Sequence, residues 1–127
     1  MYAHIKGIVS PVLADRAIIE AAGVGYELIC SANTLRRLTD GREAKLYTHF
    51  HVAQDGIALY GFYSDEERSM FRRLITVSRI GPKAAINVLS VLSPEDIALW
   101  SSLAVDALTG MPLSSRREAL RWLFQRN

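Results

Sequence analysis

The residues best suited to chemistry in this chain are a run of cations that leads into a tight turn. Five cations and no acidic residue lie between positions 68 and 83: Arg68, Arg72, Arg73, Arg79 and Lys83. The turn at residues 79–83 contains Gly81-Pro82 and predicts a hairpin between two helices. Backbone amides at the start of a helix lack acceptors, and the helix dipole makes that end positive. We therefore expect this hairpin to bind phosphate oxygens, and so a nucleic-acid backbone.

Within this first hairpin, the predicted phosphate donors are the amides of Gly81, Lys83 and Ala84, and the Lys83 ammonium adds charge. Ile80 is expected to pack between the two helices. Arg79 has two interpretations. A non-glycine residue is strained there if the backbone needs a positive φ, but a guanidinium can also bind a phosphate bidentately. The alternative for the whole hairpin is an inert packing turn.

A second candidate hairpin lies nearer the C-terminal end of the chain. A weak internal repeat with an offset of 34 residues places Arg117 at the position of Lys83. Ser114 and Ser115 offer hydroxyl groups to a phosphate, and Arg116 and Arg117 offer charge. The alternative is a surface helix whose arginines are simply solvated. The two turns together predict a tandem helix–hairpin–helix region over residues 64–127.

The first half of the chain has the pattern of short strands. Strands are predicted over residues 5–13 with an interruption at Ser10-Pro11, over 17–21 and over 26–30, with a break or bulge at 23–25. Residues 31–38 suggest a short helix, and two more strands flank an Asp55-Gly56 turn. Five or six short strands with one small helix favour a closed barrel. The predicted fold class is α+β: a mainly β barrel at residues 1–63, then helices at 64–127.

Composition indicates a folded domain but does not identify its ligand. Half of the residues are apolar, 22% are charged and the net charge is only +2, which is too small to prove a polyanionic partner. The single cysteine, Cys30, excludes an internal disulfide and is expected to be buried rather than reactive. We expect a cytoplasmic protein with no membrane contact, because no apolar run reaches 18 residues and no signal-peptide pattern is present.

Other chemistry has little support in the sequence. His49 and His51 share one face of a strand, but no third ligand of suitable spacing accompanies them. No Walker motif, nucleophile elbow or convincing carboxylate pair is present. We therefore predict no metal site, no cofactor and no catalytic residue. Tyr60 and Phe62 could stack bases if the barrel bound single strands, but aromatic residues of a closing strand usually belong to a core.

Taken together, the motifs resemble the RuvA family. The similarity covers residues 1–92 and is carried by Gly23-Val24-Gly25-Tyr26-Glu27, Thr48-His49-Phe50, Leu59-Tyr60-Gly61-Phe62, Glu67-Arg68, Phe71, Leu74-Ile75 and Gly81-Pro82-Lys83-Ala85. The resemblance implies an oligonucleotide-binding-type (OB-fold) barrel followed by helix–hairpin–helix units. It implies sequence-independent binding of four-way (Holliday) junction DNA, a homotetramer, and a role in branch migration and recombinational repair with a separate ATPase motor.

The resemblance also assigns an acidic pin and reveals departures. The pin positions are Gln54 and Asp55, so one of two charges is missing, and Asp55 is equally suited to being an ordinary turn residue. The first hairpin has Arg79 in place of a glycine, and the second hairpin lacks both of its glycines. Nothing in residues 1–127 corresponds to the family's domain that recruits the RuvB motor. We therefore expect contact with such a motor to be missing.

Two rival functions stay open at this point. One is a single-stranded DNA binder that uses the face of the barrel. The other is a scaffold or inhibitory relative that has lost DNA binding through its altered hairpins. Titrations with junction, duplex and single-stranded DNA would separate these alternatives from junction binding.

Overall fold

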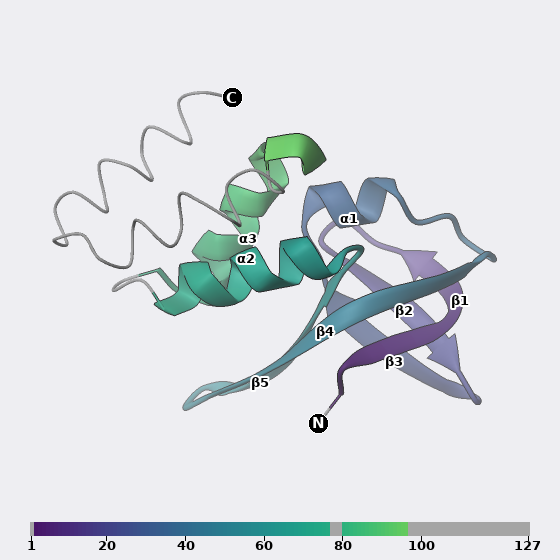
Figure 1. Ribbon diagram of the computed structural model, residues 1–127. Coiled ribbons are helices and arrows are strands. Elements are labelled where there is room, and N and C mark those ends of the chain that lie inside the picture. Colours follow the sequence, from purple (N-terminus) through teal and green to yellow (C-terminus); the bar gives the residue numbers. More distant parts are fainter. Residues whose placement is uncertain (1, 77–79, 97–127) are drawn as a thin grey trace, which may run out of the picture.

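The first half of the protein is a closed five-stranded barrel (Figure 1). The computed structural model describes residues 2–76 and 80–96. The strands are β1 (His4–Val12), β2 (Arg16–Ala21), β3 (Val24–Ile29), β4 (Glu43–Ala53) and β5 (Gly56–Phe62). They follow the order β1-β2-β3-β5-β4 around the barrel, with β1 paired to β4. All pairs are antiparallel except β3 with β5. The predicted OB-type barrel is therefore confirmed.

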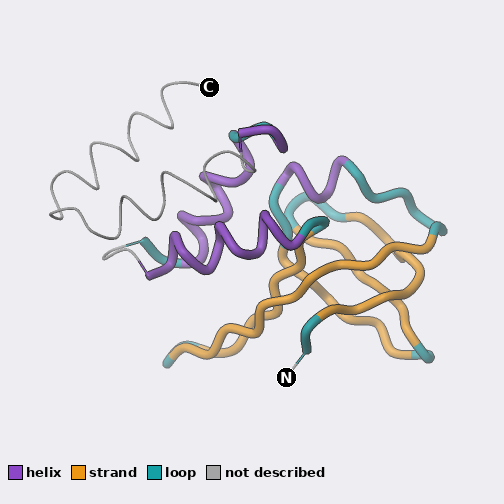
Figure 2. The backbone as a smooth tube through the Cα atoms, viewed as in Figure 1, coloured by secondary structure: helices purple, strands orange, loops and turns teal. Residues whose placement is uncertain are grey.

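In the part of the chain that the structure describes, three helices of at least five residues accompany the barrel (Figure 2). They are α1 (Ala32–Arg36), between β3 and β4, and the successive helices α2 (Asp65–Thr76) and α3 (Pro82–Val91). Serine hydroxyls cap the starts of α1 and α2. The hydroxyl of Ser31 accepts from the Thr34 amide at 3.2 Å, and that of Ser64 accepts from the Glu67 amide at 3.2 Å. Ser93 likewise accepts from the amide of Asp96 at 3.0 Å, and residues 94–96 are helical.

The predicted break at residues 23–25 is wrong in detail. The chain turns at Ala22-Gly23, where φ is 51° and 80°, and Val24 and Gly25 already belong to β3. Two successive positive φ angles are the signature of a two-residue hairpin turn whose twist matches the flanking strands. β1 also continues through the predicted interruption at Ser10-Pro11, and its pairing with β2 shifts in register between Val9 and Val12.

The β4–β5 hairpin turns one residue earlier than predicted. Ala53 pairs with Gly56, so the two loop residues are Gln54 and Asp55, and Gly56 is the first residue of β5. This long hairpin extends away from the barrel and runs past α2 (Figure 1). The loop therefore lies at the tip of a projection rather than at the rim of the barrel.

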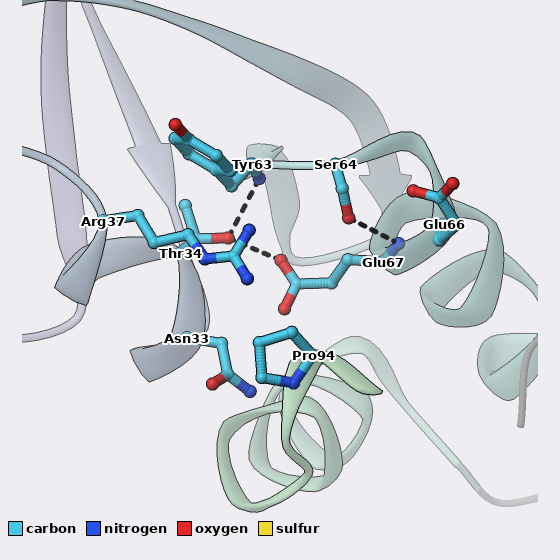
Figure 3. Close-up of a pocket in the computed structure, with 8 residues that line it drawn as sticks. All are labelled: Asn33, Thr34, Arg37, Tyr63, Ser64, Glu66, Glu67 and Pro94. Carbon is cyan, nitrogen blue, oxygen red and sulfur yellow. Dashed lines mark hydrogen bonds between the residues drawn. The ribbon is translucent and has the colours of Figure 1, made fainter. Parts of the chain in front are cut away.

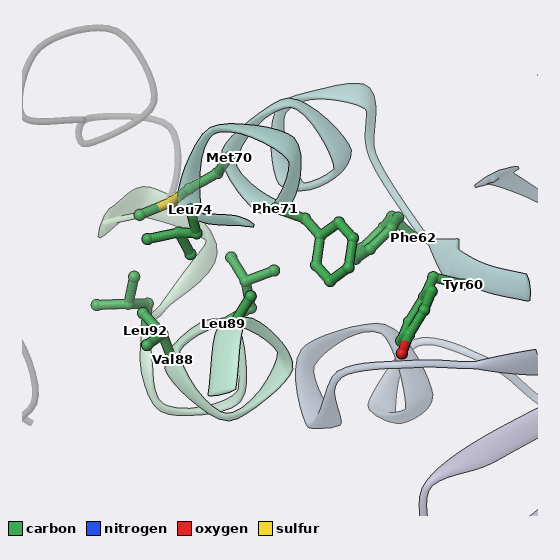
Figure 4. Packing of buried hydrophobic residues seen from close by; sticks show 9 residues of the cluster. Tyr60, Phe62, Met70, Phe71, Leu74, Val88, Leu89 and Leu92 are labelled. Carbon is green, nitrogen blue, oxygen red and sulfur yellow. The ribbon is translucent and has the colours of Figure 1, made fainter. Parts of the chain in front are cut away.

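Two apolar clusters form the core, and β5 contributes to both. Side chains on one face of β5, Tyr60 and Phe62, pack with Met70, Phe71, Leu74, Ala85, Val88, Leu89 and Leu92 of the helices (Figure 4). On the other face, Leu59 packs against the interior of the barrel, which includes Ile19, Leu28 and Leu46. This alternation is the period-two pattern of a strand buried on both sides.

Several predictions lie outside the described residues. They concern Arg79 and the second hairpin with Ser114, Ser115, Arg116 and Arg117. The division of the chain into domains at residues 63 and 64 also stays a prediction. Among the helices that the structure describes, none combines the length and the apolar character needed to cross a membrane.

Candidate nucleic-acid interface

The N-terminus of α3 offers open backbone amides. Gly81 is the N-cap residue and Pro82 occupies the first turn, so the first amides of the helix belong to Lys83 and Ala84. The Ala85 amide already donates to the Gly81 carbonyl at 3.0 Å, whereas Lys83 and Ala84 have no carbonyl four residues earlier within the helix. Among the described residues, no side chain is seen to cap these amides. They can therefore donate to a ligand.

The space around this turn suits the close approach of a phosphate. A Cβ atom added at Gly81 would meet no heavy atom within 4 Å, and the side chains of Lys83 and Ala84 are exposed. Gly81 has φ of −86° and ψ of 173°, which any residue can adopt. Glycine is useful here because it leaves room, not because the backbone requires it. Ile80 is half-buried and packs against the helical core, as predicted.

The tip of the β4–β5 hairpin lies across a groove from α3. Gln54 and Asp55 are both exposed at the tip. Between the tip and the start of α3 is a groove of about 310 Å³, and its lining includes Asp55, Pro82 and Lys83. The fold thus brings the predicted pin position and the predicted phosphate donor to the walls of a single groove.

The first cation of α2, Arg68, faces the barrel rather than solvent. The side chain of Arg68 is only 15% exposed and donates to the Ala3 carbonyl at 2.7 Å and to Asp65 Oδ1 at 2.6 Å. Its guanidinium also lies 5.3 Å from the centre of the Tyr47 ring. Arg68 therefore holds α2 against β4, and most of its side chain is withdrawn from solvent. The fold explains this, because Arg68 lies on the side of α2 that faces the strand.

Arg72 and His49 form a second contact between α2 and β4. Arg72 Nε donates to His49 Nδ1 at 3.3 Å, and the His49 ring packs edge-on against Phe71 with 5.3 Å between ring centres. Burial, followed by the positive charge of Arg72, lowers the pKa of His49. The Arg72 side chain is exposed, so it keeps the contact with solvent that Arg68 largely lacks.

The aromatic residues of β5 are not available for base stacking. Tyr60 is 7% exposed and Phe62 is fully buried, and both rings pack against Phe71. The single-strand platform that relied on these rings is therefore not supported by the geometry. Cys30 is also buried, and burial raises the pKa of its thiol to about 12, so it stays protonated near neutral pH.

A buried carboxylate, which the sequence did not single out, joins α2 to α1. Glu67 is 3% exposed and accepts hydrogen bonds from the hydroxyls of Ser31, at 2.8 Å, and Thr34. Thr34 Oγ1 in turn accepts from the Tyr63 amide at 3.0 Å. Burial raises the pKa of Glu67, and the two hydroxyl donors oppose that rise. Figure 3 shows this carboxylate beside a pocket of about 290 Å³.

Asn33 joins α1 to the end of α3. Its side-chain amide donates to the carbonyls of Leu89 and Leu92, and the Ala32 amide donates to Ser90 Oγ at 3.0 Å. Together with Glu67, these bonds tie both helices of the hairpin to α1. We call Ser31, Asn33, Thr34, Glu67 and Ser90 the buried polar cluster. It fixes the direction in which the start of α3 points relative to the barrel.

The histidines do not assemble a metal site in the described residues. His49 and His51 lie side by side, with 6.0 Å between ring centres. In the part of the chain that the structure describes, no group of three or more His, Cys, Asp or Glu side chains could hold an ion.

Comparison with known proteins identifies relatives over most of the chain. Residues 1–61 match the family model of the RuvA N-terminal domain. The chain is 44% identical over 128 residues to the Holliday junction branch migration complex subunit RuvA of Nocardia farcinica, which covers 98% of this chain and 63% of the relative. The subunits of the same name from Alkaliphilus oremlandii and Acidobacterium capsulatum are 35% and 48% identical, covering 98% and 75% of this chain. The chain spans 65% and 48% of the length of those two relatives.

Proposed function

Residues 1–61 are a RuvA N-terminal domain and the chain belongs to the RuvA family, and from this premise we propose that it binds four-way DNA junctions through their phosphates. Binding is independent of sequence, because backbone amides and ammonium groups contact phosphates rather than base edges. The protein would support branch migration, as the names of its relatives suggest, and through it recombinational repair.

The observation that carries this proposal is the open N-terminus of α3. The amides of Lys83 and Ala84 have no intrahelical acceptor, Gly81 leaves the approach free, and the Lys83 side chain is exposed. An oxyanion placed there would accept two backbone hydrogen bonds and lie at the positive end of the helix dipole. Lys83 would add a full charge at the same point.

The other predicted site residues take secondary roles in this proposal. Arg79, Ser114, Ser115, Arg116 and Arg117 would add phosphate contacts farther along each DNA arm, and Gln54 and Asp55 would face the centre of the junction. The Asp55 carboxylate would repel phosphates there and so steer the separating strands. Replacing Arg116 and Arg117 by alanine should then flatten the salt dependence of binding.

The protein acts without catalysis of its own in this proposal. It would work in the cytoplasm as a homotetramer, with one subunit facing each arm. A separate ATP-driven motor of the RuvB type would move the DNA. Each of these points rests on family resemblance.

The proposal is tested by titrating junction, duplex and single-stranded DNA with wild-type protein and with Lys83→Ala. We expect the substitution to weaken junction binding by about tenfold, because a charge-assisted phosphate contact is lost. The slope of log affinity against log salt should also fall by about 0.9. Lys6→Ala is the matched control, because Lys6 is an exposed lysine on β1 that pairs with Glu43 at 3.5 Å.

Each result has a defined meaning. Equal affinity for junction and single strands would favour the single-strand rival, and no DNA binding at all would favour the scaffold rival. If Lys83→Ala and Lys6→Ala behave alike, the start of α3 is not the phosphate site.

A further inference from the structure

The groove between the β4–β5 hairpin and α3 is a cavity with opposite charges at its two sides. Its volume is about 310 Å³, which is the lower end of the range for small-ligand pockets. The lining residues come from two elements far apart in sequence: His51, Ala53, Asp55, Gly56, Ile57, Ala58, Tyr60, Pro82 and Lys83. The groove connects the start of α3 with the tip of the β4–β5 hairpin.

One side of the groove is suited to a phosphate group. Lys83 supplies an exposed ammonium and its backbone amide at the start of α3. From β4, the half-buried His51 presents its ring, which lies edge-on to Tyr60 with 6.4 Å between ring centres. An imidazole N–H donates hydrogen bonds to oxyanions. This side therefore offers donors from two directions to the same ligand.

The other side of the groove is suited to a hydrogen-bond donor. Asp55 is exposed. Within residues 2–76 and 80–96, its carboxylate is seen in no ion pair and no side-chain hydrogen bond. Tyr60, which forms part of the lining, has its pKa raised by burial and then by the Asp55 charge, so the carboxylate is near the groove. A carboxylate repels phosphate but accepts hydrogen bonds from the amino groups of bases.

The wall between these two sides is apolar. Ala53 and Ala58 contribute to it, and both lie on the face of the β4–β5 hairpin that carries His51. Exposed aliphatic side chains next to polar groups can pack against a sugar or the face of a base. Along β4 the lining runs from the His51 ring through the small Ala53 side chain to the Asp55 carboxylate at the tip. A nucleotide has a matching order of phosphate, sugar with base face, and base amino group.

We propose that this groove holds one unpaired nucleotide of the junction, with its phosphate at Lys83 and His51 and its base amino group at Asp55. The inference rests on the proposed function and extends it, because it adds a site for a base to a protein that otherwise contacts phosphates. An unpaired base reaches such a site at lower cost than a paired one, since no base pair has to be broken.

The test compares four-way junctions that differ only at the crossover. One is fully paired, one carries a single unpaired cytosine, and one carries a single unpaired thymine. Wild-type protein should bind the cytosine junction about tenfold more tightly than the paired junction, because a charged hydrogen bond is gained. Thymine has no exocyclic amino group to donate to Asp55, so its junction should show a smaller gain.

Two neighbouring substitutions separate the groove from the rest of the hairpin. Ala53→Trp fills the groove, because Ala53 is exposed and belongs to the lining. Val52→Trp is the matched control, because Val52 is 66% exposed on the same strand but points to the opposite face. Ala53→Trp should abolish the preference for the unpaired nucleotide, whereas Val52→Trp should keep it. His51→Ala, a smaller change, should reduce the preference for cytosine and thymine alike.

The outcomes distinguish this inference from the proposed function. If wild-type protein binds junctions but shows no preference for an unpaired nucleotide, the groove inference fails alone. If Val52→Trp removes the preference as fully as Ala53→Trp does, the site is not the groove. If the wild type binds no junction, the proposed function itself fails.

Discussion

The two ends of the α2–α3 pair are built in opposite ways. At the end near α1, Glu67 and Asn33 are buried, and their side chains form hydrogen bonds within the protein. At the end near the β4–β5 tip, the first amides of α3 have no intrahelical acceptor, and Lys83 and Asp55 are exposed. The hydrogen-bonded end fixes the position of the two helices, and the end with open backbone amides can bind a ligand. A substitution in the buried polar cluster should therefore change stability, whereas one at the groove should change DNA binding.

The largest effect is expected from Glu67→Ala. The substitution leaves the Ser31 and Thr34 hydroxyls without their acceptor and creates a void, so the free energy of unfolding should fall by about 2–4 kcal/mol. Urea unfolding measures this change. Glu66→Ala is the control, because Glu66 is the exposed neighbouring residue with the same charge. Equal losses for the two variants would show that the buried polar cluster contributes nothing to stability beyond the effect of a negative charge at the helix start.

The Glu67 carboxylate should also give the protein a specific dependence on pH. Burial raises the pKa of Glu67 above its ordinary value of 4.5, so the folded state takes up a proton more readily than the unfolded state. The stability contributed by that proton is present below pH 4.5 and is lost as the pH rises through the folded pKa. Glu67→Gln has no such titration, so the difference in unfolding free energy between wild type and variant should change with pH in this window.

A smaller effect, on binding alone, is expected from Asp55→Asn. Removing a negative charge near DNA phosphates should tighten junction binding by about threefold at low salt, with little change for duplex. Asparagine keeps an acceptor oxygen for a base amino group, so the substitution isolates the effect of charge. Competition titrations with junction and duplex on one preparation measure the difference. Equal changes for both DNA forms would make Asp55 a turn residue without a role at the junction centre.

The smallest effect is expected from His49→Gln, and it concerns pH. Burial and the Arg72 charge lower the pKa of His49, so the unfolded chain takes up a proton before the folded protein does. The protein should therefore lose stability as the pH falls through the ordinary histidine value of 6.5. His49→Gln should reduce this loss and keep an acceptor for Arg72. His4→Gln, at an exposed histidine on β1, should leave the loss unchanged.

Much of the fold could be predicted from short stretches of sequence. The serine caps, the Gly81-Pro82 helix start and the β4–β5 hairpin each depend on residues within a few positions of one another. The open start of α3 could be predicted for the same reason, because it follows from the position of Gly81-Pro82 at a helix boundary. The position of the turn at Ala22-Gly23 was missed because glycines at both 23 and 25 left it ambiguous.

The buried polar cluster could not be predicted, because the residues that form its hydrogen bonds are distant from one another in sequence. Glu67 bonds to residues more than 30 positions earlier, and Asn33 bonds to carbonyls more than 50 positions later. Within the sequence, Glu67 is one of three consecutive acids at a helix start, and nothing in that pattern marks it as buried. Arg68 was assigned to a cationic surface for the same reason. Which side of α2 faces β4 is decided by packing of the whole domain.

Strand β5 has a consequence for the cooperativity of the protein. Its even-numbered side chains, Tyr60 and Phe62, complete the core of the helices, while Leu59 and Gly61 face the interior of the barrel. Neither core is complete without this strand, so loss of β5 exposes both at once. The barrel and the helix pair should therefore melt in a single transition. A fragment that ends just after Phe62 would expose two aromatic rings, which makes it a poor candidate for an autonomous folding unit.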